Sequence, residues 1–136
     1  MTKIVIDTNV IASAIFFGGR PRELLEYLIE RKLNAFVTED IILEYQETVQ
    51  ELCSRYPTKP PRLPLGKIIT ACTIIEKRTS VSVCRDPDDN KFIECAIDGN
   101  CLYIVSGDKD LLTIGNYDGV QIVTVTDFLS EWFAAE

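Results

Sequence analysis

The stretch KIVIDTNVI, residues 3–11, decides the expected fold of this chain. Its first half, from Ile4 to Ile6, is a run of β-branched apolar residues, which is typical of a strand that is buried on both faces. The run ends directly in a carboxylate, Asp7, and the residues from Asn9 onward have the spacing of a short helix. In sheets of parallel strands, active sites lie beyond the carboxyl ends of the strands. We therefore expect Asp7 to lie at the functional edge of a central strand.

The rest of the chain alternates short apolar strands with amphipathic helices. Strands are predicted at residues 3–7, 34–38, 81–84, 102–106 and 120–125. Helices are predicted at residues 9–17, 21–32, 39–52, 65–78 and 127–136, and a turn that starts at Asp86 leads into one more helix that ends at Gly99. This alternation predicts an α/β fold with a mostly parallel central sheet of about five strands, covered by helices on both faces.

The proline-rich stretch YPTKPPRLP, residues 56–64, is predicted to be a loop. It has the composition of a linker between domains, but the strands that follow it need partners from the first half of the chain. Apolar residues make up 46% of the sequence, which is enough for a core. We therefore expect a single domain over residues 1–136.

The composition excludes several classes of protein. Five isolated cysteines and no histidine argue against both a disulfide framework and a zinc site. No apolar run reaches the roughly 20 residues that are needed to cross a bilayer, and residues 1–9 do not have the pattern of a secretory signal. We expect a cytoplasmic protein without membrane contact.

The charge is distributed unevenly. The chain carries a net charge of −7, which argues against broad, nonspecific binding of nucleic acid. Residues 55–78, however, hold six basic residues and one acid, a local charge of +5. Such a segment is either a solvated surface or a surface that binds the phosphate backbone of a nucleic acid. The candidates for backbone contact are Arg20, Arg22, Lys59, Arg62 and Lys67.

Acidic side chains follow two more of the predicted strands. Asp108 and Asp110 follow the strand at residues 102–106, and the strand at residues 81–84 is followed by Asp86, Asp88 and Asp89. A single Asp at such a place is most often a helix cap or a turn residue. Three acidic groups at one edge of a sheet repel one another, and a divalent cation neutralises them better than the few nearby basic residues. Carboxylates without histidine or thiolate suit Mg²⁺ or Mn²⁺.

Metal-activated water is the expected nucleophile, because the chain lacks histidine and no serine has an obvious base partner. A phosphatase of the haloacid dehalogenase type also begins with a strand-end Asp. That chemistry requires a second Asp two residues later, where this chain has Asn9. Glu44, on the helix predicted at residues 39–52, is one more candidate ligand, although most glutamates on amphipathic helices are solvated.

Three segments of the sequence resemble the PIN domain family. They are IVIDTNVIASAI at residues 4–15, LEYQETV at residues 43–49 and RDPDDNKFIECAIDGNCLYIVSGDKDLL at residues 85–112. Together they are similar to the prokaryotic PIN proteins that are often described as toxins of toxin–antitoxin systems. The resemblance implies a three-layer α/β/α sandwich and metal-dependent cleavage of RNA.

The resemblance also implies roles for particular residues. The acids that match the catalytic and metal-binding positions of the family are Asp7, Glu44, Asp89 and Asp108. Asn9 and Ser106 match positions that support the site by hydrogen bonds, and Asp110 is an additional supporting candidate. Asp88 remains an alternative to Asp89, because a shift of one residue would exchange them.

The sequence therefore predicts a Mg²⁺- or Mn²⁺-dependent endoribonuclease, the toxin of a toxin–antitoxin system, in which activated water hydrolyses the RNA phosphodiester. The alternative is a non-catalytic PIN-like module that binds RNA or a protein. The expected partners are an RNA substrate, a cognate antitoxin encoded nearby and a second copy of the chain in a homodimer.

Overall fold

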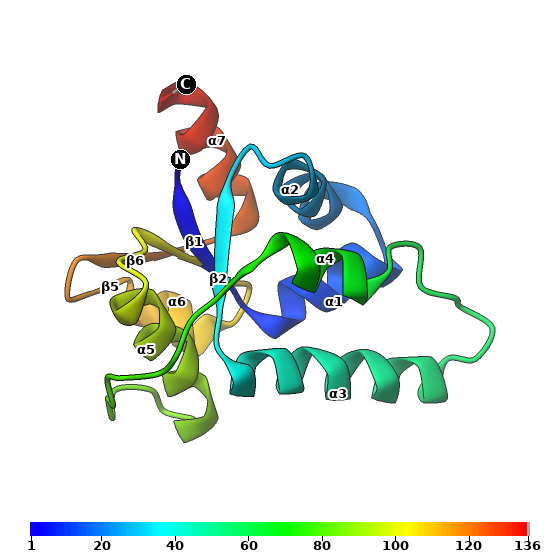
Figure 1. Ribbon diagram of the computed structural model, residues 1–136, viewed down its shortest axis with the longest axis horizontal. Coiled ribbons are helices and arrows are strands. Elements are labelled where there is room, and N and C mark those ends of the chain that lie inside the picture. Colours follow the sequence, from blue (N-terminus) through cyan, green and yellow to red (C-terminus); the bar gives the residue numbers. More distant parts are fainter. Residues whose placement is uncertain (136) are drawn as a thin grey trace.

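A six-stranded sheet forms the centre of the computed structural model, which describes residues 1–135 (Figure 1). The strands are β1 (Lys3–Ile6), β2 (Asn34–Val37), β3 (Thr73–Ile74), β4 (Tyr103–Val105), β5 (Asn116–Tyr117) and β6 (Val120–Val123). They lie in the order β3-β2-β1-β4-β6-β5, and every neighbouring pair is parallel except β5 with β6. The predicted α/β fold with a mostly parallel sheet is therefore confirmed, with six strands instead of about five.

Helices cover both faces of this sheet. They are α1 (Thr8–Phe16), α2 (Gly19–Ile29), α3 (Glu39–Arg55), α4 (Leu65–Ala71), α5 (Asn90–Asp98), α6 (Lys109–Ile114) and α7 (Val125–Ala135), and a 3-10 turn spans Pro87–Asp89. Figure 1 shows α5 on one side of β1 and β2, and α1 and α2 on the other. Helix α5 packs against β1, β2, β4 and β6, whereas α2 packs against α1 and α7. No helix in residues 1–135 is long and apolar enough to span a bilayer.

Strand β1 is central, as its sequence predicts. Ile4 and Val5 have no exposed surface and Ile6 is only 1% exposed, because both faces of the strand are covered. Strands β2 and β4 flank β1 and run parallel to it. The carboxyl ends of β1 and β4 therefore meet at one edge of the sheet.

Two predictions about the third strand are wrong. The predicted helix at residues 65–78 ends at Ala71, and the chain then forms strand β3. Thr73 and Ile74 pair with the end of β2, and the N–H of Ile75 continues this ladder to the carbonyl of Val37 at 2.9 Å. Residues 81–84, the predicted strand, have no regular structure. The short strand β5 and the short helix α6 are absent from the prediction.

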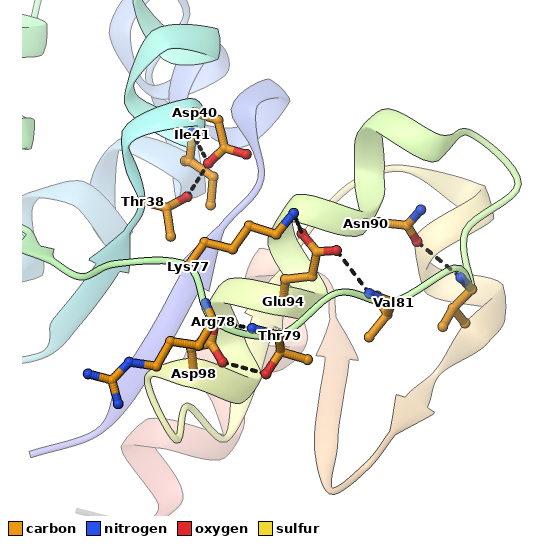
Figure 2. A network of polar contacts seen from close by, with 11 residues as sticks. Thr38, Asp40, Ile41, Lys77, Arg78, Thr79, Val81, Asn90, Glu94 and Asp98 are labelled. Atoms are coloured by element: carbon orange, nitrogen blue, oxygen red, sulfur yellow. Dashed lines mark hydrogen bonds and ion pairs between the residues drawn. The ribbon is translucent and has the colours of Figure 1, made fainter.

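Helix α5 explains why residues 81–84 do not join the sheet. Three of its side chains, spaced four residues apart on one face, are Asn90, Glu94 and Asp98. Their oxygens accept hydrogen bonds from five N–H groups within residues 76–84, a segment that we call the strap (Figure 2). These N–H groups of the strap are thus satisfied by side chains instead of by a neighbouring strand. It runs along α5 and delivers the chain to the acids at residues 86–89.

Candidate active site

Asp7 lies where β1 becomes α1. Its N–H donates to the carbonyl of Val105 at 3.0 Å, which extends the pairing of β1 with β4 by one residue. Its carbonyl accepts from the N–H of Val10 at 3.0 Å and begins α1. The side chain of Asp7 makes no capping hydrogen bond to this helix and is only 4% exposed. The carboxylate is therefore held at the edge of the sheet for another role.

Ser106 connects Asp7 to Asp108 at this edge. The Ser106 Oγ donates to Asp7 Oδ2 at 2.7 Å and accepts from the N–H of Asp108 at 3.0 Å. Ser106 itself is 1% exposed and follows β4. The hydroxyl therefore fixes the side chain of one acid and the backbone of another.

The charges of Asp7, Asp89 and Asp108 influence one another. Burial raises the pKa of Asp7, and the negative charges of Asp108 and Glu44 add to this increase, while the hydrogen bond from Ser106 opposes it. Burial raises the pKa of Asp89 to about 7, with further contributions from the charges of Asp108 and Asp7. The charges of these three acids therefore act on one another, and their mutual repulsion disfavours three separate negative charges.

Three other candidate acids, Asp86, Asp88 and Asp110, lie in different surroundings. Asp86 accepts from the N–H of Asp88 at 3.0 Å and caps the turn that follows. Asp88 lines a hollow of about 530 Å³ together with Lys77, and Asp7 and Asp89 do not line this hollow. Asp110 Oδ1 lies 4.0 Å from Arg85 Nη1, and the N–H of Asp110 donates to Asp108 Oδ1 at 3.3 Å. This geometry favours Asp89 over Asp88 as the acid that faces Asp7.

Glu44 approaches the site from α3 but is already paired. Its Oε1 accepts from Lys91 Nζ at 2.8 Å, and its Oε2 accepts from the hydroxyl of Thr8. Glu44 and Lys91 are 27% and 17% exposed, so the pair is partly shielded from water. The pKa of Lys91 is raised: burial alone would lower it, but the hydrogen bond and the charge of Glu44 exceed that effect.

Tyr45 is a supporting residue that the sequence identifies only as part of the core. It is 1% exposed, and its hydroxyl donates to the carbonyl of Ile6, the last residue of β1. This bond fixes α3 against the strand end and therefore sets the position of Glu44. The position of Tyr45 in the apolar pattern of its helix predicts that the side chain is buried. The pattern does not predict a hydrogen bond to Ile6, which lies 39 positions earlier in the sequence.

The donor set fits a hard divalent cation in its chemistry. Asp7, Asp89 and Asp108 supply carboxylate oxygens, the ligands that Mg²⁺ and Mn²⁺ prefer. Within residues 1–135, no three acidic, cysteine or histidine side chains are close enough to form a complete ligand set as they stand. A cation would therefore have to draw these carboxylates together, and it would relieve the repulsion that adds to burial in raising the pKa of Asp89.

Two of the five predicted basic contacts lie at the end of α1 that is far from these acids. Arg22 Nε donates to the carbonyl of Ala14 at 3.0 Å and satisfies the end of α1. Lys59 Nζ lies 4.0 Å from the ring centroid of Phe17, also beyond that end. Nine helical residues separate this end from Asp7, a distance of about 13 Å. Arg20 differs, because it lines a hollow that reaches Ser106.

Comparisons with known proteins agree with this architecture. Residues 3–110 match the sequence model of the family described as the PIN domain. The chain is 36% identical over 118 residues to the uncharacterized protein MJ1680 of Methanocaldococcus jannaschii, which covers 82% of this chain and 74% of that protein. The crystal structure of PAE2754 from Pyrobaculum aerophilum is similar with a TM-score of 0.62 at 16% identity, over 100% of this chain and 91% of that one. This chain belongs to the PIN domain family.

Proposed function

We propose that the protein is a Mg²⁺- or Mn²⁺-dependent endoribonuclease. The observation that carries this proposal is that Asp7 and Asp108 lie at the carboxyl ends of the neighbouring strands β1 and β4, and that burial and the charges of these two acids raise the pKa of Asp89 to about 7. Uncompensated carboxylates at this edge are suited to a hard cation and to phosphoryl chemistry. Membership of a family whose members are typically nucleases supports the same reaction.

The residues of the chain hold this arrangement in place. Ser106 orients the Asp7 carboxylate and anchors the backbone of Asp108. Thr8 and Lys91 hold both oxygens of Glu44 beside the start of α1. A bound Mg²⁺ or Mn²⁺ would supply a Lewis acid that activates water and stabilises the leaving oxygen.

The proposed substrate is single-stranded or looped RNA, cleaved to leave 5′-phosphate and 3′-hydroxyl ends. The acids lie close to the sheet edge, where splayed phosphates reach them more easily than the backbone of a rigid duplex does. The net charge of −7 also disfavours a broad surface for duplex binding.

The direct test is cleavage of a panel of RNAs with Mg²⁺, with Mn²⁺ and with a chelator. The wild-type protein is expected to cleave with either ion, and Asp7→Asn is expected to lose most of this activity. Asp118→Asn is the matched control, because it makes the same chemical change at an exposed turn residue with φ of 52°, a backbone conformation that Asn tolerates. Equal rates for the wild type and Asp7→Asn would contradict the proposal.

A non-catalytic binding module is the second candidate. The pairing of Glu44 with Lys91 favours it, because this bond occupies one of the four matched acids. RNA binding without cleavage, under conditions where both ions are supplied, would support this alternative.

We further propose a toxin role, in the cytoplasm, with a cognate antitoxin and a homodimer as partners. These proposals depend on the resemblance to prokaryotic PIN toxins. The neighbouring reading frame tests the first partner, since a small DNA-binding protein encoded there is expected. Light scattering of the purified chain tests the second, and a mass of 15.3 kDa at micromolar concentration would exclude a stable dimer.

A further inference from the structure

A hollow of about 390 Å³ opens beside the proposed active site, and we call it the side hollow. Its wall is formed by the first turns of α1, the beginning of α2, the residues after β4 and the start of α7. Ser106 belongs to both places, since it lines the side hollow and its Oγ donates to Asp7 Oδ2 at 2.7 Å. A molecule in the side hollow would therefore lie next to the candidate catalytic acids.

The charge of the side hollow is opposite to that of the acids. Ten residues line it, none of them is acidic, and Arg20 is the one that carries a formal charge. Arg20 pairs with Glu23 at 3.3 Å, but both side chains are substantially exposed, at 48% and 36%. An exposed pair of this kind is weak, so the guanidinium can exchange Glu23 for another anion at little cost.

The other side chains of the wall match the remaining parts of a nucleotide. Ser13, Thr124 and Thr126 supply hydroxyls, and the Thr124 Oγ1 accepts from the N–H of Asp127 at 3.1 Å, which leaves its own hydrogen free to donate. Val10 and Val125 supply apolar surface. A phosphate can pair with the guanidinium, a ribose can bond to the hydroxyls, and the face of a base can pack on the apolar surface.

We propose that the side hollow binds one nucleotide of the RNA strand adjacent to the scissile phosphodiester, with Arg20 contacting its phosphate. This subsite rests on the proposed nuclease function, because it extends the path of the same strand. It supplies attraction that the acids cannot, since they repel the phosphate backbone until a cation is present. A single nucleotide enters such a hollow only when it is unpaired, so the subsite selects single-stranded RNA.

The salt dependence of RNA binding tests the contact of Arg20. Binding of a fluorescein-labelled oligouridylate of about ten nucleotides is measured by anisotropy in the Asp7→Asn background, which separates binding from cleavage. Arg20→Met is expected to weaken binding and to reduce the slope of log affinity against log salt by about 0.7, the value for one phosphate contact on a single strand. Lys32→Met is the control, because Lys32 is also an exposed basic residue that pairs with a nearby glutamate, Glu30, and it lies outside the basic segment at residues 55–78. It is expected to keep the slope.

A second pair of variants tests the position of the subsite on α7. Thr126→Glu places a carboxylate at the wall of the side hollow, whereas Ser130→Glu places one on the same helix a turn later, at another exposed residue. An acid in the first turn of a helix favours the helix, so Thr126→Glu is expected to fold. Repulsion of the phosphate is expected to weaken RNA binding by roughly tenfold in Thr126→Glu relative to Ser130→Glu.

The outcomes separate this inference from the proposed function. Equal affinities and salt slopes for Arg20→Met and Lys32→Met, or no RNA binding at all, would overturn the subsite. If the wild type also cleaves RNA in that case, the nuclease function stands without the subsite. If binding depends on Arg20 but neither Mg²⁺ nor Mn²⁺ supports cleavage, the nuclease function fails and the side hollow remains an RNA-binding site.

Discussion

At the scale of single residues, Glu44 differs from the other acids because it already has a cation. Lys91 Nζ lies 2.8 Å from its Oε1, and both side chains are less than one third exposed. Asp7, by contrast, is buried with a hydroxyl as its partner, and the pKa of Asp89 rises to about 7. Lys91 therefore neutralises the charge of Glu44, whereas no basic side chain in the part of the chain that the structure describes neutralises Asp7 and Asp89 in the same way.

Replacement of Lys91 tests how close Glu44 lies to the bound cation. Lys91→Met leaves a partly buried carboxylate without its ion pair, so the free energy of unfolding of the metal-free protein is expected to fall by about 1 kcal/mol. It also removes a positive charge that repels an incoming cation, so the stabilisation by Mn²⁺ is expected to be larger than in the wild type. Urea unfolding with and without Mn²⁺ measures both effects, and Lys91→Arg serves as the control that keeps the charge. The same Mn²⁺ stabilisation in Lys91→Met and the wild type would place Glu44 outside the cation site.

At the scale of elements, α5 organises the chain on both sides of the acids. The strap lies along one face of this helix and reaches the turn at residues 86–89 (Figure 2). The opposite side of the helix packs against the sheet, where Phe92 and Ile93 have no exposed surface. The position of Asp89, directly before α5, therefore depends on both the strap and the core.

The pH dependence of stability tests the strap. Burial tends to raise the pKa of Asp98, but hydrogen bonds from Thr79 and Arg78 outweigh it, and the pKa is lowered from 3.8. A lowered folded-state pKa contributes stability that is present above the unfolded-state pKa and is lost as pH falls through the folded-state value. Asp98→Asn is expected to be less stable than the wild type by about 1 kcal/mol at neutral pH, a figure reduced for the exposure of the site. The difference should shrink below pH 3.8, and a difference that is constant with pH in urea titrations would contradict this account.

The end of α5 has a second constraint, at Gly99. A Cβ placed there would lie 2.8 Å from Phe36 Cδ2 and 3.1 Å from Cys101 Sγ. Phe36 is buried in β2, so Gly99→Ala is expected to reduce the free energy of unfolding by about 1–3 kcal/mol through overpacking. Gly66→Ala is the control, because a Cβ on that residue of α4 meets nothing within 4 Å and is expected to stabilise the protein by about 0.5 kcal/mol. Chemical denaturation of both variants measures the difference, and equal stabilities would show that α5 does not pack this closely on β2.

At the scale of the whole molecule, the central strand and its acid are predictable because their signal is local. Residues 4–6 are apolar on both faces, and a carboxylate ends the run, so the place of Asp7 follows from the sequence. Strand β3 is not predictable in this way, since it consists of two residues that are strands only because they pair with β2. Residues 81–84 have the composition of a strand, but their N–H groups bond to side chains of α5.

The same difference between local and distant signals applies to the candidate site. The sequence places Asp7 and Asp108 correctly after β1 and β4, but the strand that it predicts before Asp89 does not form, and it cannot decide between Asp88 and Asp89. The pairing of Glu44 with Lys91 joins residues 47 apart, and the bond of Tyr45 to β1 spans 39. These contacts arise from tertiary packing, which periodicity does not encode.

The most direct measurement of the central claim is a Mn²⁺ titration, by calorimetry, of the wild type and of four Asp→Asn variants. The account predicts saturable binding to the wild type and to Asp118→Asn, and binding that is strongly weakened by replacement of Asp7, Asp89 or Asp108. Binding to the folded state should also raise the free energy of unfolding, by about 2.7 kcal/mol at a Mn²⁺ concentration 100 times the dissociation constant. If the wild type shows no binding, or if all four variants bind Mn²⁺ like the wild type, these acids do not form a cation site.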